Sequence, residues 1–455
     1  MTGLEILRAV ATGERSAREV CEAALADIAR SDERINAFTE CTTARALAEA
    51  DAVDGRRARG EVLPPLAGLP YAVKNLFDIA GVTTLAGSKI NRELPPARAD
   101  AVLVQRLQAA GAVLVGALNM DEYAYGFSTE NTHYGPSRNP HDPGRMAGGS
   151  SGGSGAAVAA KQVPLALGSD TNGSIRVPAS LCGTWGMKPT FGRLSRRGTY
   201  PFVHSIDHLG PLADSVETLA LSYDAMQGPD PLDPGCHALR VQPASERLDR
   251  GIAGLRIGIL GGYFHDLATP AARSVAELAA RTLGARDTVE WPDAAIGRAA
   301  AFIITASEGG SLHLDDLRKR PQDFEPLSVD RFIAGALQPA DWYLRAQRFR
   351  RVYRDKVNAL FRDWDVLVAP ATPVSAPRIG EDWIDINGQK HPSRPSLGLL
   401  TQPVSFAGCP VVAAPLWPEG TGGMPIGVQL IAAPWKEELC LRAAKVLQAS
   451  GVAHP

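Results

Sequence analysis

Hydrophobic and polar positions near the start of the chain repeat with a helical period. Val20, Ala24 and Ile28 recur at a spacing that places them on one helix face. Ser16 precedes this run, and Glu19 lies three positions after Ser16. A serine followed at this distance by a glutamate forms a capping box. The pattern therefore predicts an amphipathic helix that begins just after Ser16.

A second amphipathic run covers Ala44–Val53 and ends near Gly55. The basic stretch Arg56–Arg59 follows it, and we expect a solvated turn there. Residues 1–60 are thus predicted to form a helical segment that packs on the core. Residues 61–455 would form the catalytic domain, and the whole would be one compact unit.

Further along, short apolar runs alternate with helical patterns. Strands are predicted at Leu69–Asn75, Ala112–Gly116 and Val163–Leu167, and helices at Ala101–Ala110 and Gly155–Lys161. Such alternation is typical of an α/β fold with a large sheet covered by helices on both faces.

Two glycine-rich loops carry the candidate chemistry. The first, Gly148–Gly155, contains Ser150, and the second, Gly168–Arg176, contains Ser174. Glycine lets the backbone approach a ligand closely. A serine hydroxyl becomes a nucleophile only when a base removes its proton. The two loops are therefore suited to acyl transfer, provided that a base lies nearby.

Lys74 closes an apolar strand in a chain where lysine is much rarer than arginine. A buried lysine loses hydration of its charged form, so its pKa falls. A neutral amine can then act as a general base near pH 7. The alternative is a lysine whose charged end reaches solvent from a strand end.

These residues resemble the amidase signature family, and the resemblance extends from about Leu4 to the last helix. It implies an amidase signature fold, with a mixed sheet, and no metal or cofactor. It also implies that Ser174 is the nucleophile, Lys74 the base, and Ser150 a bridging serine after a cis peptide bond. Further matching segments are Asn119–Ala124, Ser128–Asn131, Asn139–Pro140, Leu399–Thr401 and Pro425–Gln429.

In the second loop, the N–H groups of Thr171, Asn172, Gly173 and Ser174 would form the oxyanion hole. Preorganised donors of this kind contribute about 2.7–4 kcal/mol each. Asn172 stands where family members commonly have glycine. Asparagine tolerates positive φ, so the loop could keep its shape. Alternatively, the Asn172 amide contacts the substrate.

Two positions bear on the substrate. A long helix is predicted over Asp341–Arg362, and in it Arg350 aligns with the arginine that holds the substrate carboxylate in glutamine-hydrolysing A subunits of tRNA-dependent amidotransferases. Those subunits also carry an aspartate before Leu-Leu-Thr, where this chain has Gly398. A carboxylated substrate without an α-amino group fits this pair better than glutamine does.

Stretches such as Leu63–Gly68 and Thr199–His204 resemble the branch of the family that acts on small carboxylated ureas. This implies hydrolysis of a terminal amide-type C–N bond, as in 1-carboxybiuret to urea-1,3-dicarboxylate and ammonia. It also implies a small helical accessory subunit, as in a heterotetramer. Alternatives are a glutamine-hydrolysing A subunit, an allophanate-type or other small-amide amidase, and a catalytically silent scaffold.

A rival motif is the G-x-S-x-G elbow of α/β-hydrolases, formally matched around Ser150. That motif needs a preceding strand, but Pro140–Gly144 is a turn cluster. His204 and His208 invite comparison with a metal site, although the apolar residues before them favour ordinary packing. Asp382–Gly388 is predicted to be a polar turn because it lacks the ligand spacing of a calcium loop.

Composition narrows the class of protein. The 455 residues are 45% hydrophobic and 21% charged, with a net charge of −2. This balance is typical of a globular protein and offers no basic surface for nucleic acid. Six dispersed cysteines argue against a disulfide framework. With no apparent signal peptide or membrane span, we expect a cytoplasmic enzyme that acts on a small molecule.

Overall fold

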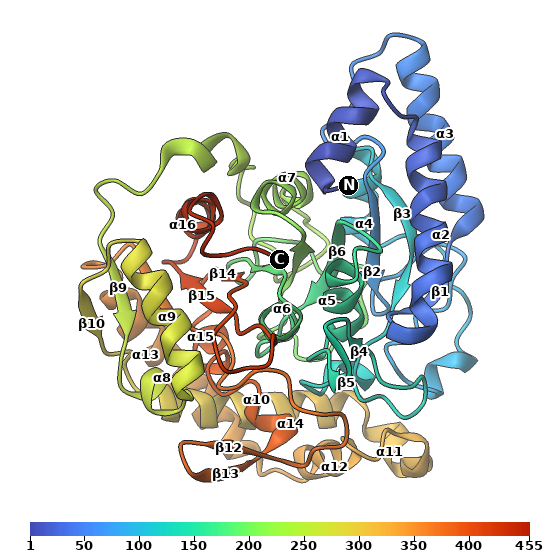
Figure 1. Ribbon diagram of the computed structural model, residues 1–455. Helices are drawn as coiled ribbons and strands as arrows, with labels where there is room; N and C mark the ends of the chain where they lie inside the picture. The colour runs from blue at the N-terminus through green and yellow to red at the C-terminus, as the bar shows by residue number, and fades with distance from the viewer.

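One mixed β-sheet of eleven strands forms the centre of the protein in the computed structural model, which describes residues 1–455 (Figure 1). Neighbouring strands pair both parallel and antiparallel, as in β2–β3 and β14–β15. In sheet order the strands are β1 (Phe38–Cys41), β3 (Val113–Leu118), β2 (Pro70–Lys74), β6 (Leu165–Ser169), β8 (Leu209–Ala213), β7 (Trp185–Lys188), β14 (Val411–Ala414), β15 (Val428–Ile431), β11 (Val366–Pro370), β9 (Ile257–Leu260) and β10 (Asp287–Val289).

Helices surround this sheet. They are α1 (Gly3–Thr12), α2 (Ala17–Ile35), α3 (Thr43–Ala58), α4 (Val102–Ala109), α5 (Gly152–Ala159), α6 (Arg176–Cys182), α7 (Val216–Met226), α8 (Tyr263–Asp266), α9 (Pro270–Thr282), α10 (Ala294–Leu312), α11 (Leu314–Lys319), α12 (Val329–Ala336), α13 (Ala340–Leu360), α14 (Ser393–Ser396), α15 (Gln402–Ala407) and α16 (Glu437–Ala449).

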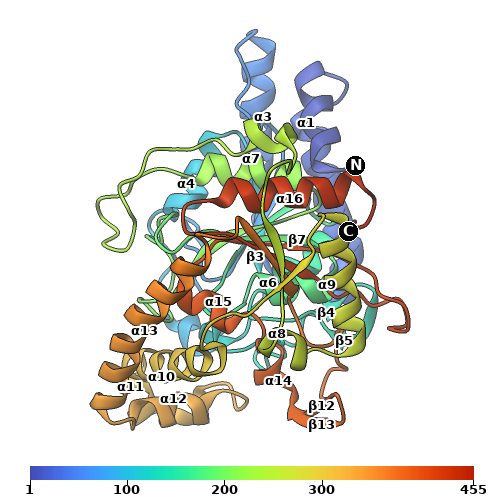
Figure 2. The same ribbon diagram turned by 90° about the vertical axis from the view of Figure 1, so that its left-hand side faces the viewer.

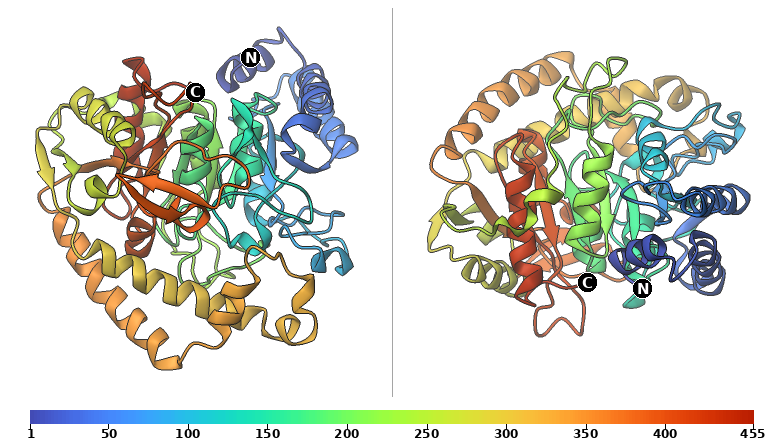
Figure 3. Two further views of the ribbon diagram at one scale, coloured as in Figure 1. Left: turned by 60° about the horizontal axis from the view of Figure 1, so that its bottom comes forward. Right: turned by 90° about the horizontal axis from the view of Figure 1, so that it is seen from above.

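The helices cover both faces of the sheet, which confirms the predicted α/β class. In Figure 1, α7 and α16 lie above the strands, while α5 and α6 lie below them. The view from above shows α7 and α16 side by side (Figure 3). A separate layer of α10, α11, α12 and α13 closes the lower side (Figure 2). No helix of the chain combines the length and apolar content that crossing a bilayer requires.

The N-terminal segment differs from the predicted all-helical one. The capping box at Ser16 and Glu19 is present, as predicted. However, β1 pairs antiparallel with β3 and adds an edge strand to the sheet. The helix α3 also continues through Gly55 to Ala58, so the expected turn there is wrong. Tertiary contacts explain this, because Arg57 donates to the carbonyls of Val10 and Arg15.

Two segments expected to be turns belong to hairpins instead. Strand β4 (Arg138–Asn139) pairs with β5 (Asp142–Met146), and β12 (Trp383–Ile386) pairs with β13 (Gln389–Pro392). In the second hairpin the turn residues Asn387 and Gly388 have positive φ, and the side chains of β12 alternate between exposed and buried. The turn residues are therefore where the sequence indicates them, but the flanking strands are not evident from it.

A buried arginine fixes α6 to the sheet. The guanidinium of Arg176 donates to both carboxylate oxygens of Asp170, at 2.9 and 3.0 Å. It also donates to the main-chain oxygen of Thr401 and to Gln429 Oε1 on β15. Burial alone would raise the pKa of Asp170, but the Arg176 charge holds it well below its usual value. This cluster thus joins the second glycine-rich loop to the C-terminal part of the chain.

We expect Arg176→Leu to lower the free energy of unfolding by about 3–5 kcal/mol, because it leaves the Asp170 carboxylate buried without a counterion. Chemical denaturation followed by circular dichroism measures this loss. The control is Arg18→Leu, which removes exposed ion pairs with Glu22 and Asp51 and should cost far less, because solvent screens such pairs. Equal losses in the two variants would contradict the role given to Arg176.

Candidate active site

The sheet brings Lys74 beside two serines. Strands β2 and β6 are parallel neighbours, so their C-terminal ends, Lys74 and Ser169, lie at the same edge of the sheet. The Lys74 side chain is fully buried. Its Nζ donates to Ser150 Oγ at 2.7 Å and to Ser169 Oγ at 2.9 Å. The Gly149–Ser150 peptide bond is cis, as the family resemblance implies.

Burial lowers the pKa of the Lys74 ammonium to about 7, against the opposing effect of carboxylates that include Asp121. A large part of the amine is therefore neutral at neutral pH. Burial lowers the pKa of Lys188 to about 7 as well. The Lys188 ammonium, however, donates to the main-chain carbonyls of Pro189 and Cys409. The hydroxyl neighbours, not the pKa, distinguish Lys74.

The backbone of Ser174 is hydrogen-bonded to the residue that follows Ser150. The N–H of Ser151 donates to the Ser174 carbonyl at 3.3 Å. The Ser174 hydroxyl makes no hydrogen bond within the protein, so the side-chain partner of Ser150 in this structure is Lys74 and not Ser174. The side chain is 3% exposed and lines a cavity.

The loop before Ser174 presents unpaired N–H groups. None of the four N–H groups from Thr171 to Ser174 donates a hydrogen bond within the protein. The positive φ falls on Gly173, at 143°, and not on Asn172. A Cβ at Gly173 would lie 2.1 Å from Thr401 Oγ1. The Thr401 hydroxyl donates to the Asn172 carbonyl at 2.7 Å and so holds the loop.

The Asn172 side chain is held at one end and free at the other. Its Nδ2 donates to Thr305 Oγ1 on α10 at 2.9 Å. Its Oδ1 is buried and has no hydrogen-bond partner. A buried acceptor without a partner costs about 1–3 kcal/mol, so this oxygen is a strong candidate for a contact with a ligand N–H.

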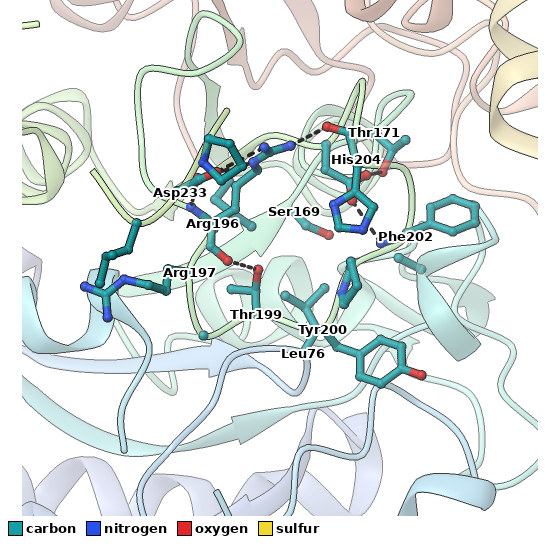
Figure 4. A pocket seen from close by; sticks show the side chains of 17 residues that line it. Leu76, Ser169, Thr171, Arg196, Arg197, Thr199, Tyr200, Phe202, His204 and Asp233 are labelled. Atoms are coloured by element: carbon teal, nitrogen blue, oxygen red, sulfur yellow. Dashed lines mark hydrogen bonds and ion pairs between the residues drawn. The ribbon is translucent and has the colours of Figure 1, made fainter. Parts of the chain in front are cut away.

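Two cavities adjoin these groups. The inner cavity contains Ser174 and is lined by Ala124, Tyr125, Gly126, Phe127, Thr171, Asn172, Ser174, Phe202, Phe302, Thr305, Arg331, Pro395 and Gln402. The outer cavity has a volume of about 280 Å³ and includes Ser169, Thr171, Arg196, Arg197 and His204 (Figure 4). Ala124, Thr171 and Phe202 line both, so the two cavities are adjacent.

The structure does not bring Arg350 into either cavity. Its Nε donates to the Phe406 carbonyl at 3.1 Å and its Nη1 to the Ser205 carbonyl at 2.6 Å. The guanidinium also faces the rings of Phe191 and Phe406. Burial lowers the pKa of Arg350 to about 10. These donors are therefore occupied by the protein itself.

Gly398 is covered by an aromatic ring. A Cβ at this position would lie 2.4–2.8 Å from ring atoms of Phe127. Phe127 also lines the inner cavity. The place that a carboxylate would occupy in a glutamine site is thus filled by an apolar ring.

The histidines singled out in the sequence make no hydrogen bond to Ser150 or Ser174. His208 is buried, and its Nδ1 contacts the Asp170 carbonyl at 3.0 Å. His204 lines the outer cavity (Figure 4). The contact partner of Ser150 is Lys74, although a strand, β5, does precede the G-x-S-x-G segment. No group of three or more His, Cys, Asp or Glu side chains is arranged to hold a metal ion.

Several residues around the site are not among those that the sequence predicts. Ser169 could have been found, because it lies inside the same G-S-D motif as Asp170. Phe127, Thr305, Arg331 and Gln402 give no sequence signal, since they converge only in the folded chain.

Comparison with known proteins places the chain among amidases. An amidase family model matches residues 19–441. AtzE, the 1-carboxybiuret hydrolase subunit of Pseudomonas sp. (strain ADP), is 78% identical over 454 residues, which cover 100% of this chain and 99% of that protein. The A subunit of the glutamyl-tRNA(Gln) amidotransferase of Anaeromyxobacter sp. (strain K) is 39% identical over 470 residues, covering 96% of this chain and 94% of that protein.

Solved structures agree with this placement. A structure described as an s-triazine catabolic enzyme, in connection with a vestigial protein complex, matches with a TM-score of 0.99 and 78% identity, covering 100% of this chain and 99% of its own. The corresponding amidotransferase protein of Thermotoga maritima matches with a TM-score of 0.82 and 28% identity, covering 98% and 94%. The chain therefore belongs to the amidase signature family.

Proposed function

We propose that this enzyme hydrolyses the terminal amide-type C–N bond of 1-carboxybiuret, which yields urea-1,3-dicarboxylate and ammonia. The observation that carries the chemistry is the buried Lys74 amine, with a pKa of about 7, in contact with Ser150 beside the cavity of Ser174. The choice of substrate is supported by the 78% identity to a 1-carboxybiuret hydrolase subunit over the full length.

In the first half of the reaction, neutral Lys74 accepts a proton from the Ser150 hydroxyl, and Ser150 accepts one from Ser174. The Ser174 oxygen attacks the terminal carbamoyl carbon. The carbonyl electron pair moves onto oxygen, which the four free N–H groups from Thr171 to Ser174 stabilise. Proton transfer requires the Ser174 and Ser150 hydroxyls to form a hydrogen bond, which this structure does not contain.

The tetrahedral intermediate then collapses. The C–N bond breaks, and the nitrogen leaves as ammonia with the proton that Lys74 returns through Ser150. A water molecule deprotonated along the same path attacks the acyl carbon. The bond to Ser174 breaks, and the acyl group leaves as the new carboxylate while Ser174 regains its proton.

Polar groups of the inner cavity fit a ureido compound. The free Oδ1 of Asn172 can accept a hydrogen bond from a substrate N–H, because Thr305 orients the amide by holding its other end. This supports Asn172 as a substrate-binding residue. The occupied donors of Arg350 leave it a weaker candidate than the sequence suggested.

Glutamine hydrolysis within a tRNA-dependent amidotransferase is the second candidate, supported by 39% identity to the A subunit of such an enzyme. The ring of Phe127 against Gly398 speaks against it, since no carboxylate is available there for an α-amino group.

We further propose a small helical accessory subunit. AtzE is described as one subunit of its enzyme, and the solved structure with 78% identity is described with a protein complex. Copurification of bound proteins with the tagged chain from its native source, followed by determination of the mass of the complex, tests this proposal, and a chain that purifies alone would contradict it.

The nucleophile assignment predicts that Ser174→Ala abolishes labelling by a fluorophosphonate and lowers ammonia release at least about 10³-fold, because no acyl-enzyme can form. Intact-mass spectrometry of the labelled protein measures the adduct. Ser151→Ala is the control, since its Oγ bonds only to Ser169 backbone atoms. Continued labelling at Ser150 in the Ser174 variant would contradict the assignment.

The base assignment predicts that kcat/KM rises with pH up to about 7 and is level above it. Lys74 acts as the base only when it is deprotonated. The rising limb of the pH profile of kcat/KM therefore follows the pKa of Lys74 in the free enzyme. Because the Asp121 carboxylate raises the pKa of Lys74, Asp121→Asn should move this limb to lower pH. Lys74→Met should remove turnover, whereas Lys188→Met should keep the limb. A limb unchanged in Asp121→Asn would count against Lys74.

The position of the Phe127 ring predicts that the Gly398→Asp variant gains no glutamine hydrolysis, because the new side chain would clash with this ring. Ammonia release from glutamine and from 1-carboxybiuret measures the choice between substrates. Release from glutamine alone in the unaltered enzyme would favour the amidotransferase function, and release from neither would favour a silent scaffold.

A further inference from the structure

One cation lines the inner cavity. Arg331, on α12, contributes to the same wall as Asn172 and Ser174. Its guanidinium lies over the ring of Tyr125, with the central carbon 4.3 Å from the ring centre. No carboxylate lies within ion-pair distance of it, and the nearby Glu130 carboxylate is paired with Arg394. Burial lowers the pKa of Arg331, although the Asp121 carboxylate, which lines a second cavity together with Arg331, opposes this effect.

Part of the Arg331 side chain is free to bind a ligand. Only its Nη2 donates within the protein, to the carbonyls of Tyr125 at 2.6 Å and Leu327 at 3.2 Å. Its Nε and Nη1 donate to no protein atom. The carbonyl contacts and the Tyr125 ring thus hold the guanidinium in place while two of its nitrogens remain available.

Arg196, Arg197 and Arg350 either are paired with a carboxylate or lie outside both cavities. In the outer cavity Arg196 pairs with Asp233 (Figure 4), and Arg197 pairs with Asp230. Arg350 donates to main-chain carbonyls. Among these side chains, Arg331 is the cation that combines a place in the Ser174 cavity with unpaired donors.

We propose that Arg331 is the anion-binding residue of the inner cavity, where it holds the substrate carboxylate while the Asn172 Oδ1 accepts a ureido N–H. This inference rests on the proposed function and deepens it, because it names the groups that select carboxylated ureas over neutral ones. A carboxylate would supply the missing counterion, and charge-assisted hydrogen bonds of this kind are about twice as strong as neutral ones.

The test uses a neutral fluorophosphonate that labels Ser174, and glutarate as a competing dicarboxylate of similar length to the substrate. Glutarate should slow labelling of the unaltered enzyme. In Arg331→Met the concentration needed for half protection should rise about 10–100-fold, the range for a hydrogen bond to a charged group. The labelling rate without glutarate should change less than about threefold, and Arg331→Lys should restore part of the protection.

Arg197→Met and Arg350→Met are the matched controls for the outer cavity and for the arginine on α13. Undiminished protection in Arg331→Met, or its loss in Arg350→Met alone, would overturn the assignment to Arg331. A collapse of labelling in Arg331→Met without glutarate would also overturn it, since that indicates a structural role. If the unaltered enzyme is not labelled at Ser174 at all, the proposed function fails instead.

The same residue should set the substrate preference. We expect the ratio of kcat/KM for 1-carboxybiuret to that for biuret to fall about tenfold or more in Arg331→Met, mainly through KM for the carboxylated compound. Equal losses on both compounds would contradict a carboxylate contact, because biuret lacks the group that Arg331 binds.

Discussion

The buried ion pair of Arg176 and Asp170 is the interaction on which the site depends. Asp170 lies just before Thr171–Ser174 in the sequence, and Arg176 lies just after Ser174. The guanidinium of Arg176 also donates to Thr401 and Gln429. Two charges inside the protein are tolerated only when each is paired and hydrogen-bonded. The pair therefore fixes the loop against β15 and the segment before α15, and leaves the N–H groups between Thr171 and Ser174 free.

The reactive groups, by contrast, are buried polar groups without a full set of partners. Lys74 is buried among hydroxyls and has no ion-pair partner, so its neutral form is favoured near pH 7. The Oδ1 of Asn172 likewise has no hydrogen-bond partner, and Arg331 donates to carbonyls through Nη2 alone and has no ion-pair partner. The fold thus satisfies the polar groups that shape the loops and leaves unsatisfied those that face the inner cavity, which suits a small polar substrate.

Much of this could be predicted from the sequence, for local reasons. The strand that ends at Lys74 comes from a short, continuous apolar run, and the helix α13 comes from a long helix-like run. Strand β1 and the hairpins could not be predicted, because their pairing partners are distant or their strands are short. The substrate-binding role predicted for Arg350 rested on the family resemblance alone, whereas the direction of its side chain depends on the carbonyls of Phe406 and Ser205.

The sequence by itself determined the family, the mixed sheet with its helices, and the lysine and serines, because short motifs with fixed glycines constrain the backbone wherever they occur. Tertiary structure alone decided what surrounds the reactive serine. Phe127, Thr305, Arg331 and Gln402 come from distant segments, and side-chain periodicity carries no information on which distant segments meet. The lining of the Ser174 cavity is set by that convergence, which exists only once the chain has folded.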